Sequence, residues 1–406
     1  MKILCVGPIK NSGHTGDTNS LDTLSGLGVD GPSRSILGLA YALTDKGAEV
    51  AVLPTKPFRV PAQEQGAPMF LGPYIGRKYN PFVHAGRWMN LVERQFGHPD
   101  LVNFHDVYDL FSVAFAATIR SRGWEYMVTP RGGLRRYAQR RDSLKKKIAN
   151  PLFFKRYLRK ALCIHALAEG EAEDIHHFDP TLRTVVIPNG ISSKVLAHPQ
   201  KVFPPKEGNK RKRIVGFIGQ IFVEIKGIDL LLEAVAELQK LGKGNNLQFV
   251  LVGPIPNRSD RRWVSQMKSR LLDPGAVKLV GPKLGNEKWE LLESFDVLIL
   301  PSRTEGMPVV ALEAMARGKP CLFSEGTNMA ELVQTAGAGW GCRVSAESIL
   351  KKLLEISKIS EEALVEMGKR GRAVVEERFT WGVVADRYLG TVQTILDSVQ
   401  VPQLRE

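Results

Sequence analysis

Residues 303–318 read Arg-Thr-Glu-Gly-Met-Pro-Val-Val-Ala-Leu-Glu-Ala-Met-Ala-Arg-Gly and contain two carboxylates, Glu305 and Glu313. The apolar run before them, residues 296–301, predicts a buried parallel strand. Pro308 suits the first turn of a helix, where its missing N–H costs nothing. We therefore expect a strand-to-helix turn with Glu305 at the start of the helix and Glu313 inside it.

Most residues around Glu313 in this helix are apolar, and a buried carboxylate is costly unless hydrogen-bond donors satisfy it. Sugar and ribose hydroxyls are such donors, and the N–H groups at the helix start can receive a diphosphate. In the alternative interpretation, Glu313 pairs with Arg317 one turn later and Glu305 caps the helix. The stretch by itself leaves both interpretations open.

Length and composition indicate the class of protein. A chain of 406 residues with 43% hydrophobic content predicts two large domains. The cysteines at 5, 163, 321 and 342 show no paired spacing, which predicts free thiols in a reducing compartment and argues against structural zinc. Because no apolar run reaches membrane-spanning length, we expect a cytoplasmic protein, with peripheral attachment to the inner face of the cell membrane as an option.

The net charge of +14 is concentrated in residues 131–160, which hold twelve basic residues and one acid. The proposed acceptor or anion patch comprises Arg131, Arg135, Arg136, Lys145, Lys146 and Lys147. Apolar residues interleave with these charges at helical spacing, which favours a surface facing anionic lipid headgroups. The alternatives are a solvated helix whose apolar side packs in the core, and a nucleic-acid surface, which we rank last.

Short apolar runs alternate with amphipathic stretches, a pattern typical of parallel sheets covered by helices on both faces. The first expected sheet contains residues 2–7, 48–53, 100–105, 126–129, 162–168 and 184–188. The second contains residues 213–219, 247–253, 277–281, 296–301 and 320–324. A linker rich in Pro, Gly and charge divides the chain into domains 1–204 and 205–380, followed by a helical segment, 381–406, that crosses back to the first domain.

Ligands of such sheets bind beyond the carboxyl ends of the strands. Lys226 follows the 213–219 strand and opens a helix, where a cation and the helical N–H groups act on the same phosphate. The alternative is an exposed loop lysine. His105 ends the 100–105 strand, a position where a histidine is more often a satisfied core residue.

The order and spacing of these motifs resemble the retaining glycosyltransferases of family 4 (group 1), of the bacterial polysaccharide or lipid-linked sugar type. The likeness extends from residue 2 to about residue 380 and is carried by 129–134, 165–171, 186–190, 226–227 and 305–313. It implies the GT-B fold, an α/β architecture of two Rossmann-like doubly wound parallel-sheet domains facing across a cleft. It also implies retention of configuration and a nucleotide-sugar donor.

The resemblance implies a donor site made of Gln220, Lys226, Glu305, Gly306, Met307, Pro308, Val309, Val310 and Glu313. In this site Glu313 accepts from the ribose hydroxyls, Glu305 holds the donor sugar, and Lys226 holds the diphosphate. The implied catalytic group is Lys226 and Glu305 with His105, which faces the reacting sugar. We expect no metal and no bound cofactor, because Lys226 and the helix dipole at Pro308 can stabilise the leaving diphosphate.

Two positions depart from the family pattern. Gln220 stands where members usually carry an arginine, and the lost charge-assisted contact costs roughly 1.5–3 kcal/mol unless a basic residue such as Arg131 offsets it. Residues 31–34 replace a pair of glycines, and the polar segment 11–30 before them predicts a mobile loop on the acceptor side. A sugar-nucleotide epimerase of the same fold and a binding subunit that has lost catalysis are the alternatives. Base, sugar, linkage, acceptor and oligomeric state are left open.

Overall fold

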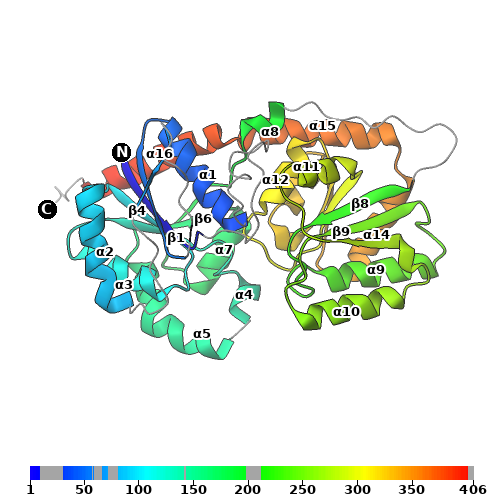
Figure 1. Cartoon of the computed structure of the whole chain (residues 1–406), viewed down its shortest axis with the longest axis horizontal. Helices are drawn as coiled ribbons and strands as arrows, with labels where there is room; N and C mark the ends of the chain where they lie inside the picture. Colours follow the sequence, from blue (N-terminus) through cyan, green and yellow to red (C-terminus); the bar gives the residue numbers. More distant parts are fainter. Residues whose placement is uncertain are drawn as a thin grey trace. The chain divides into compact units, whose positions relative to one another are not determined.

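The computed structural model describes residues 1–9, 31–56, 58, 66–71, 81–140, 143–197 and 212–400. The chain divides into two compact units (Figure 1). The first contains the described residues up to Gly190 together with those from Thr380, and the second contains Ile191–Phe379. The expected boundary at residue 205 and the loop expected at 11–30 lie outside the described residues.

In the described part of the first unit, seven parallel strands form a sheet of order β3-β2-β1-β4-β5-β6-β7. The strands are β1 (Lys2–Gly7), β2 (Glu49–Pro54), β3 (Met69–Phe70), β4 (Leu101–His105), β5 (Tyr126–Thr129), β6 (Ile164–Ala166) and β7 (Thr184–Val186). The apolar runs predicted each of these strands except β3, which is too short to show a pattern. The strand order reverses beside β1, so the carboxyl ends of β1 and β4 form a ligand-binding position of the fold.

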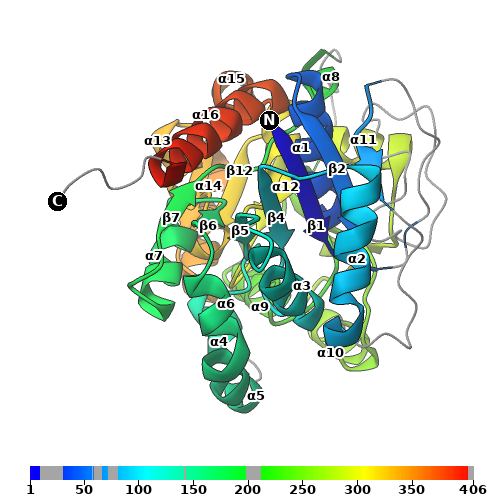
Figure 2. The same cartoon turned by 90° about the vertical axis from the view of Figure 1, so that its left-hand side faces the viewer.

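Helices cover both faces of this sheet. They are α1 (Gly31–Asp45), α2 (Pro81–Gln95), α3 (Leu110–Arg120), α4 (Arg136–Arg140), α5 (Ser143–Ala149), the π-helix η1 (Asn150–Phe154), α6 (Lys155–Arg159), α7 (Glu169–Phe178) and α16 (Trp381–Gln400). Figure 2 shows α1 and α16 on one side of the strands and α3 and α6 on the other.

The C-terminal helix α16 packs against α1. Its first residue, Trp381, lies so close to two glycines that a Cβ at Gly38 or Gly190 would come within 2.4 or 2.5 Å of the indole ring. The chain leaves the first unit after Gly190 and returns to it after Phe379, and Ile191 N donates to Phe379 O at 2.8 Å. The two connections between the units therefore lie side by side.

The second unit has six parallel strands among its described residues, in the order β10-β9-β8-β11-β12-β13. They are β8 (Arg213–Ile218), β9 (Leu247–Val252), β10 (Val277–Val280), β11 (Val297–Leu300), β12 (Cys321–Ser324) and β13 (Gly339–Cys342). The sequence did not predict β13, because its two glycines interrupt the apolar pattern. Gly339 is needed there, since a Cβ would lie 2.0 Å from Cys321 O on the neighbouring strand.

The helices of this unit are α8 (Ser193–Ala197), α9 (Ile228–Lys240), α10 (Arg258–Ser269), the 3₁₀ turns η2 (Pro274–Ala276) and η3 (Glu325–Thr327), α11 (Gly285–Ser294), α12 (Val309–Ala316), α13 (Ala330–Thr335), α14 (Ala346–Lys358) and α15 (Glu361–Arg378). In Figure 1, α11, α12 and α15 lie on one side of the sheet and α9, α10 and α14 on the other. The strand order reverses beside β8, whose neighbour β11 leads into the stretch at 303–318.

Candidate functional site

The loop between β11 and α12 carries Glu305 and is held by the segment that follows β12. Glu305 N donates to Gly326 O at 2.7 Å, and the Asn328 side-chain amide donates to Glu305 O at 3.0 Å and to Gly306 O at 2.6 Å. Gly326 is required for this approach, because a Cβ there would lie 2.1 Å from Ser302 O. The backbone around Glu305 is thus positioned by hydrogen bonds from outside its own loop.

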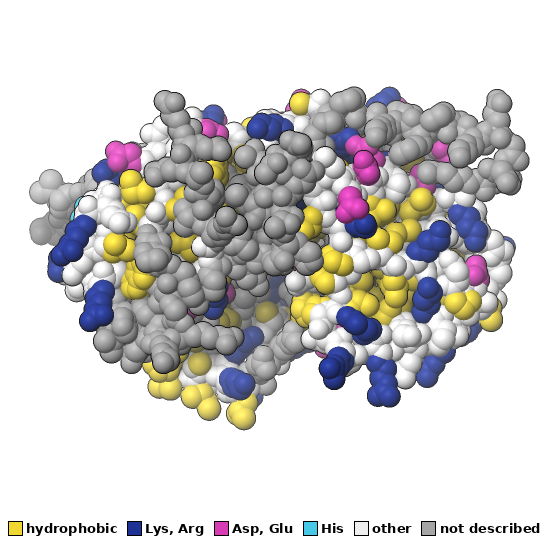
Figure 3. All heavy atoms as spheres, viewed as in Figure 1, with side chains coloured by type: hydrophobic (Ala, Val, Ile, Leu, Met, Phe, Trp, Pro, Cys, Tyr) yellow, Lys and Arg dark blue, Asp and Glu magenta, His cyan; other side chains and the backbone are white. Residues whose placement is uncertain are grey.

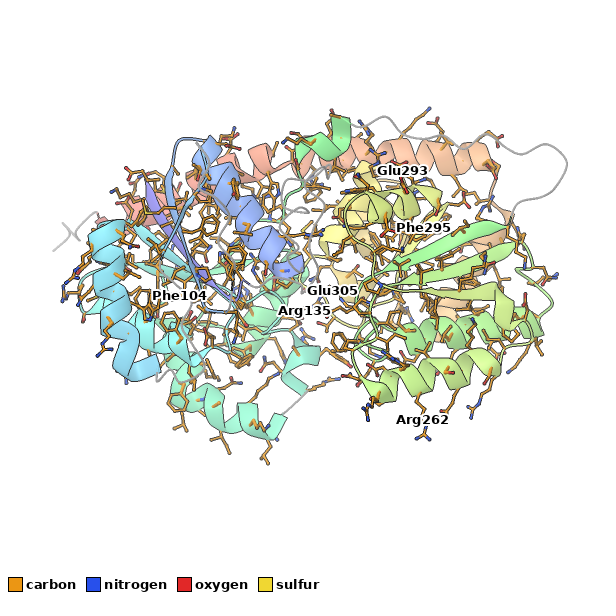
Figure 4. All side chains as sticks on the ribbon, in the orientation of Figure 1. Phe104, Arg135, Arg262, Glu293, Phe295 and Glu305 are labelled. Atoms are coloured by element: carbon orange, nitrogen blue, oxygen red, sulfur yellow. The ribbon has the colours of Figure 1, made fainter. Side chains whose placement is uncertain are left out.

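Lys226 and Glu305 meet at the carboxyl ends of the adjacent strands β8 and β11. Lys226 Nζ lies 2.5 Å from Glu305 Oε1, and Ser302 Oγ donates to the same oxygen at 2.9 Å. The Lys226 turn contacts the end of β11 closely: Gly227 has φ +65°, and a Cβ on it would lie 2.0 Å from Pro301 O. Figure 4 shows Glu305 on the loop that precedes α12.

A second ion pair ties the Lys226 turn to the Glu305 loop. The Arg303 guanidinium donates to both carboxylate oxygens of Asp229 at 2.6 Å and to Glu224 O at 2.6 Å. Arg303 N also donates to Ile225 O at 2.9 Å. A bidentate guanidinium–carboxylate pair is geometrically specific, so this contact fixes the two loops on each other. The sequence did not predict this ion pair, because no local spacing connects residues 229 and 303.

Glu313 is 2% exposed on α12, and its ion pair differs from the alternative interpretation. Lys288 Nζ of α11, itself 6% exposed, lies 2.5 Å from Glu313 Oε1. Arg317, the partner expected in that interpretation, pairs instead with Glu293 of α11, which Figure 4 labels. The sequence did not predict that Lys288 is the partner of Glu313, because the two residues lie 25 positions apart on different helices.

The start of α12 is partly exposed and can therefore contact a ligand. Pro308 is the N-cap of the helix, one position before the first turn in which we expected it. Val309 and Val310 are its first two residues and are half-buried, as is Gly306, whereas Met307 is buried. The N–H groups of the first residues of a helix have no intrahelical acceptor, which suits them to an anion.

Gln220 is the second residue after β8, and it is exposed. The backbone there is ordered by the neighbouring loop, because Ile221 N donates to Pro254 O at 2.9 Å. Arg131, which we expected to offset the missing charge, belongs to the first unit. Its guanidinium donates to Ser35 Oγ at 2.7 Å and to His105 Nδ1 at 3.2 Å.

His105 ends β4 and is fully buried. Burial, the Arg131 guanidinium and His165 hold the pKa of His105 well below its usual value, so the imidazole is neutral. Because Arg131 donates to Nδ1, the proton is assigned to Nε2. Nε2 is buried and has no hydrogen-bond partner within the described residues.

Helix α7 supports the loop that carries Arg131. The fully buried Glu171 accepts from Gly132 N at 2.5 Å and from Leu167 N at 2.8 Å. One turn later, Asp174 lies 2.9 Å from Arg135 Nε and pairs also with Arg136 at 3.0 Å. Arg131 itself has φ +51°, a left-handed conformation that is uncommon for a non-glycine residue and must be held by such contacts.

Two families of known proteins match the chain, each over one part of its length. The family described as glycosyl transferases group 1 matches residues 200–374, and the one described as Glycosyltransferase Family 4 matches residues 29–194. The chain belongs to the group 1, family 4 glycosyltransferases.

Among its relatives is the D-inositol 3-phosphate glycosyltransferase of Stackebrandtia nassauensis, which is 29% identical over 57% of this chain and 53% of its own length. The amylovoran biosynthesis glycosyltransferase AmsK of Erwinia amylovora is 31% identical over 38% of this chain and 39% of its own. The matches thus span about half or less of these relatives. The solved structure of Anabaena Alr3699/HepE in complex with UDP is similar over 97% of this chain and 100% of its own, with TM-score 0.68 and 17% identity, which shows the GT-B fold.

The basic segment of this glycosyltransferase forms α4, α5, η1 and α6 in the first unit. Its apolar residues divide into two groups. The exposed ones, with their exposed fractions, are Leu144 (73%), Ile148 (59%), Leu152 (62%) and Phe153 (40%). The buried ones are Phe154, Tyr157 and Leu158. Of these residues, the interpretation in which the apolar side packs in the core therefore holds only for Phe154, Tyr157 and Leu158.

The six residues of the expected anion patch differ in their contacts. Arg131 contacts His105, and Arg135 and Arg136 share Asp174. Lys146 donates to Ala138 O and lies 5.1 Å from the centre of the Tyr108 ring.

Lys145 and Lys147 are exposed on α5 beside the apolar group. Figure 3 shows hydrophobic side chains at the lower edge of this unit, where α5 lies in Figure 1. None of the described helices of this glycosyltransferase is both long enough and apolar enough to cross a membrane.

Proposed function

We propose that this protein transfers a sugar from a nucleotide-diphosphate donor to a hydroxyl of a carbohydrate or lipid-linked acceptor, with retention, in cell-surface polysaccharide or glycolipid biosynthesis. The observation that carries the proposal is the grouping of Lys226, Glu305 and Glu313 around the β8 and β11 strand ends and helix α12. The UDP bound to the structurally similar HepE supports a nucleotide donor. The amylovoran and inositol phosphate relatives support a carbohydrate-related acceptor.

In this proposal the donor binds to the second unit. Glu313 accepts hydrogen bonds from the ribose hydroxyls, because a carboxylate only accepts and a hydroxyl donates. The N–H groups of Val309 and Val310 and the ammonium of Lys226 bind the diphosphate. Glu305, with the backbone of residues 306–308, binds the donor sugar.

Cleavage of the anomeric bond leaves negative charge on the diphosphate. Lys226 is fixed by its Glu305 partner before the reaction, so little reorganisation is needed when that charge develops. We propose metal-independent stabilisation by this cation and by the helix start, with attack and departure on the same face of the sugar. Gln220 can add only neutral hydrogen bonds.

The proposed role of His105 is to donate from Nε2 to a sugar hydroxyl. The support for this role is its neutral state, its fixed tautomer and the unpartnered buried Nε2. A buried N–H without an acceptor is costly, and a sugar oxygen would satisfy it.

We also propose peripheral attachment to an anionic membrane surface through α5 and the residues that follow it. An exposed apolar group flanked by lysines is the arrangement of an interfacial helix, in which apolar side chains enter the headgroup region and lysines meet lipid phosphates. A lipid-linked acceptor would lie at such a surface.

The test is to incubate the purified protein with a panel of nucleotide sugars and to measure thermal stabilisation, slow hydrolysis and then transfer to candidate acceptors. We expect one donor to stabilise the protein, and acceptor-dependent release of its nucleotide diphosphate to persist in EDTA. Acceptor-independent isomerisation of the donor would indicate an epimerase instead. Tight donor binding with no release under any acceptor would indicate a binding subunit.

A further inference from the structure

Lys288 and Glu313 form an ion pair in the interior of the second unit. Their side chains are 8% and 3% exposed, and Nζ lies 2.5 Å from Oε1. Lys288 comes from α11 and Glu313 from α12, so the contact depends on the packing of these two helices. Lys288 Nζ also lies 4.9 Å from the centre of the Trp289 ring, a position that favours a cation.

A buried ion pair is a weak source of stability, because desolvation of two charges offsets most of their attraction. An apolar pair of similar volume would serve packing at least as well. The surroundings of Glu313 on α12 are suited to such a pair, since Ala311, Leu312, Ala314 and Met315 are all fully buried. The two charges therefore call for a reason other than packing.

Ribose recognition supplies that reason. A charge-assisted contact to one carboxylate oxygen holds the carboxylate in a defined orientation, so its lone pairs point in fixed directions. A carboxylate offers about four lone-pair sites, so the bond from Lys288 uses only part of its acceptor capacity.

We propose that Lys288 is a positioning residue for nucleotide recognition: through its contact with Oε1 it orients the Glu313 carboxylate to accept from the ribose hydroxyls. This inference rests on the proposed role of Glu313. Lys288 acts through Glu313 and does not itself bind the nucleotide. Replacing it should therefore affect the ribose and not the diphosphate.

The experiment uses the full chain and measures the Kd of ADP, GDP, UDP and CDP by calorimetry. The tightest binder is then compared with its 2′-deoxy form. For wild type we expect the 2′-deoxy form to bind about tenfold more weakly, the size of one hydrogen bond to a charged group. Lys288→Met should reduce this preference to about twofold or less, and Lys288→Arg, which keeps the cation, should restore most of it.

Lys283→Met is the matched control, because Lys283 is a half-buried lysine that pairs with the exposed Glu287 of the same helix α11, whereas Lys288 pairs with Glu313. It should keep the wild-type preference. A folded Lys288→Met protein with the wild-type preference would overturn the inference.

Glu313→Gln separates this inference from the proposed function. If Glu313→Gln keeps the wild-type preference, Glu313 does not bind ribose and both proposals are wrong. If Glu313→Gln loses the preference but Lys288→Met keeps it, only the role of Lys288 is wrong.

A double variant covers the case in which Lys288→Met alone does not fold. Lys288→Met combined with Glu313→Gln leaves no uncompensated buried charge, so it should fold. It should bind the diphosphate as tightly as Glu313→Gln alone, because Lys288 has no role without the carboxylate. A further weakening of tenfold or more would show that Lys288 contacts the nucleotide directly and would overturn the inference.

Discussion

Lys226 and Glu305 are 79 residues apart in the sequence, yet Lys226 Nζ lies 2.5 Å from Glu305 Oε1. The pair joins the turn after β8 to the loop after β11, so the proposed phosphate ligand and the proposed sugar ligand are adjacent. Its carboxylate also accepts from Ser302, which fixes the oxygen that faces the ammonium.

Lys226→Ala should reduce kcat by about 10- to 100-fold with a smaller effect on donor Kd, because the ammonium acts mainly on charge that develops in the transition state. Steady-state transfer kinetics and calorimetry measure the two effects separately. Lys240→Ala is the control, since Lys240 forms an exposed pair with Glu237 at the end of α9. Wild-type turnover in Lys226→Ala would refute the proposed role.

Gln220→Arg should tighten binding of the nucleoside diphosphate about tenfold, because an arginine replaces neutral hydrogen bonds with charge-assisted ones. Gln220 is exposed, so the larger side chain should be accommodated without a cost in stability. Gln266→Arg, at an exposed position of α10, adds the same charge away from the site and should leave the Kd unchanged. Equal affinities for wild type and Gln220→Arg would mean that the charge is supplied by another residue.

Sedimentation with vesicles tests the membrane surface. The protein should bind phosphatidylglycerol vesicles and not phosphatidylcholine vesicles. Each lysine near an anionic surface contributes about 1 kcal/mol, so Lys145→Glu with Lys147→Glu should lower the affinity at least ~10-fold. Ile148→Gln, at a side chain 59% exposed, should also weaken binding.

Lys351→Glu reverses an exposed charge on α14 of the second unit and should have little effect on vesicle binding. Binding that survives both the charge reversals on α5 and Ile148→Gln would refute attachment through this helix. Retention on DNA at moderate salt would point to nucleic acid instead.

Because of His165, the stability of the first unit should decrease as the pH decreases. Burial lowers the pKa of this histidine to about 4, from an unfolded value near 6.5. The unfolded chain therefore binds the proton first as the pH falls, and stability is lost between about pH 6.5 and 4. From pH 7 to pH 5 the free energy of unfolding of the first unit should fall by about 2 kcal/mol. Urea unfolding at the two pH values measures this difference.

His165→Gln should remove this contribution to the pH dependence, whereas His177→Gln, at an exposed position, should keep it. His105 contributes in the same direction, because its pKa is also lowered by burial. A pH dependence in His165→Gln equal to that of wild type would contradict the assignment to His165.

Gly38→Ala should destabilise the first unit by about 1–3 kcal/mol, because the added Cβ would lie 2.4 Å from the Trp381 ring and force α16 away from α1. Thermal unfolding measures this as a lower Tm. Gly86→Ala on α2 is the matched control, since no atom lies within 4 Å of its Cβ position. It should leave the stability unchanged or raise it by up to about 1 kcal/mol. Equal Tm values for the two variants would argue against tight packing of Trp381.

The strands could be predicted from the sequence where apolar runs were long enough to show burial on both faces. β1 and β5 were predicted to the residue. β3, with two residues, and β13, with two glycines in four positions, were not predicted, because neither shows an apolar run. Both lie at edges of their sheets, where neighbouring strands and not the strand's own residues determine the pairing.

The candidate site was predictable in its residue types but not in its contacts. Lys226 and Glu305 were recognised because each follows a strand, and strand ends are where ligands of this fold bind. The sequence did not predict that Lys288 and Asp229 form ion pairs, or that Glu171 supports a loop. Their roles depend on which helices pack together, and no local pattern in the sequence carries that information.

The sequence by itself determined the two parallel sheets, the order of their elements and the positions of the residues at strand ends. It could do so because burial of a strand and the start of a helix are local properties, visible in the spacing of apolar residues. Only the tertiary structure decided the partners of the charged side chains: Lys288 forms the ion pair with Glu313, Arg317 pairs with Glu293, and Arg131 donates a hydrogen bond to the neutral His105. A buried charge takes the partner that the packing of distant helices and strands brings within about 3 Å, and that distance is not a property of any one segment.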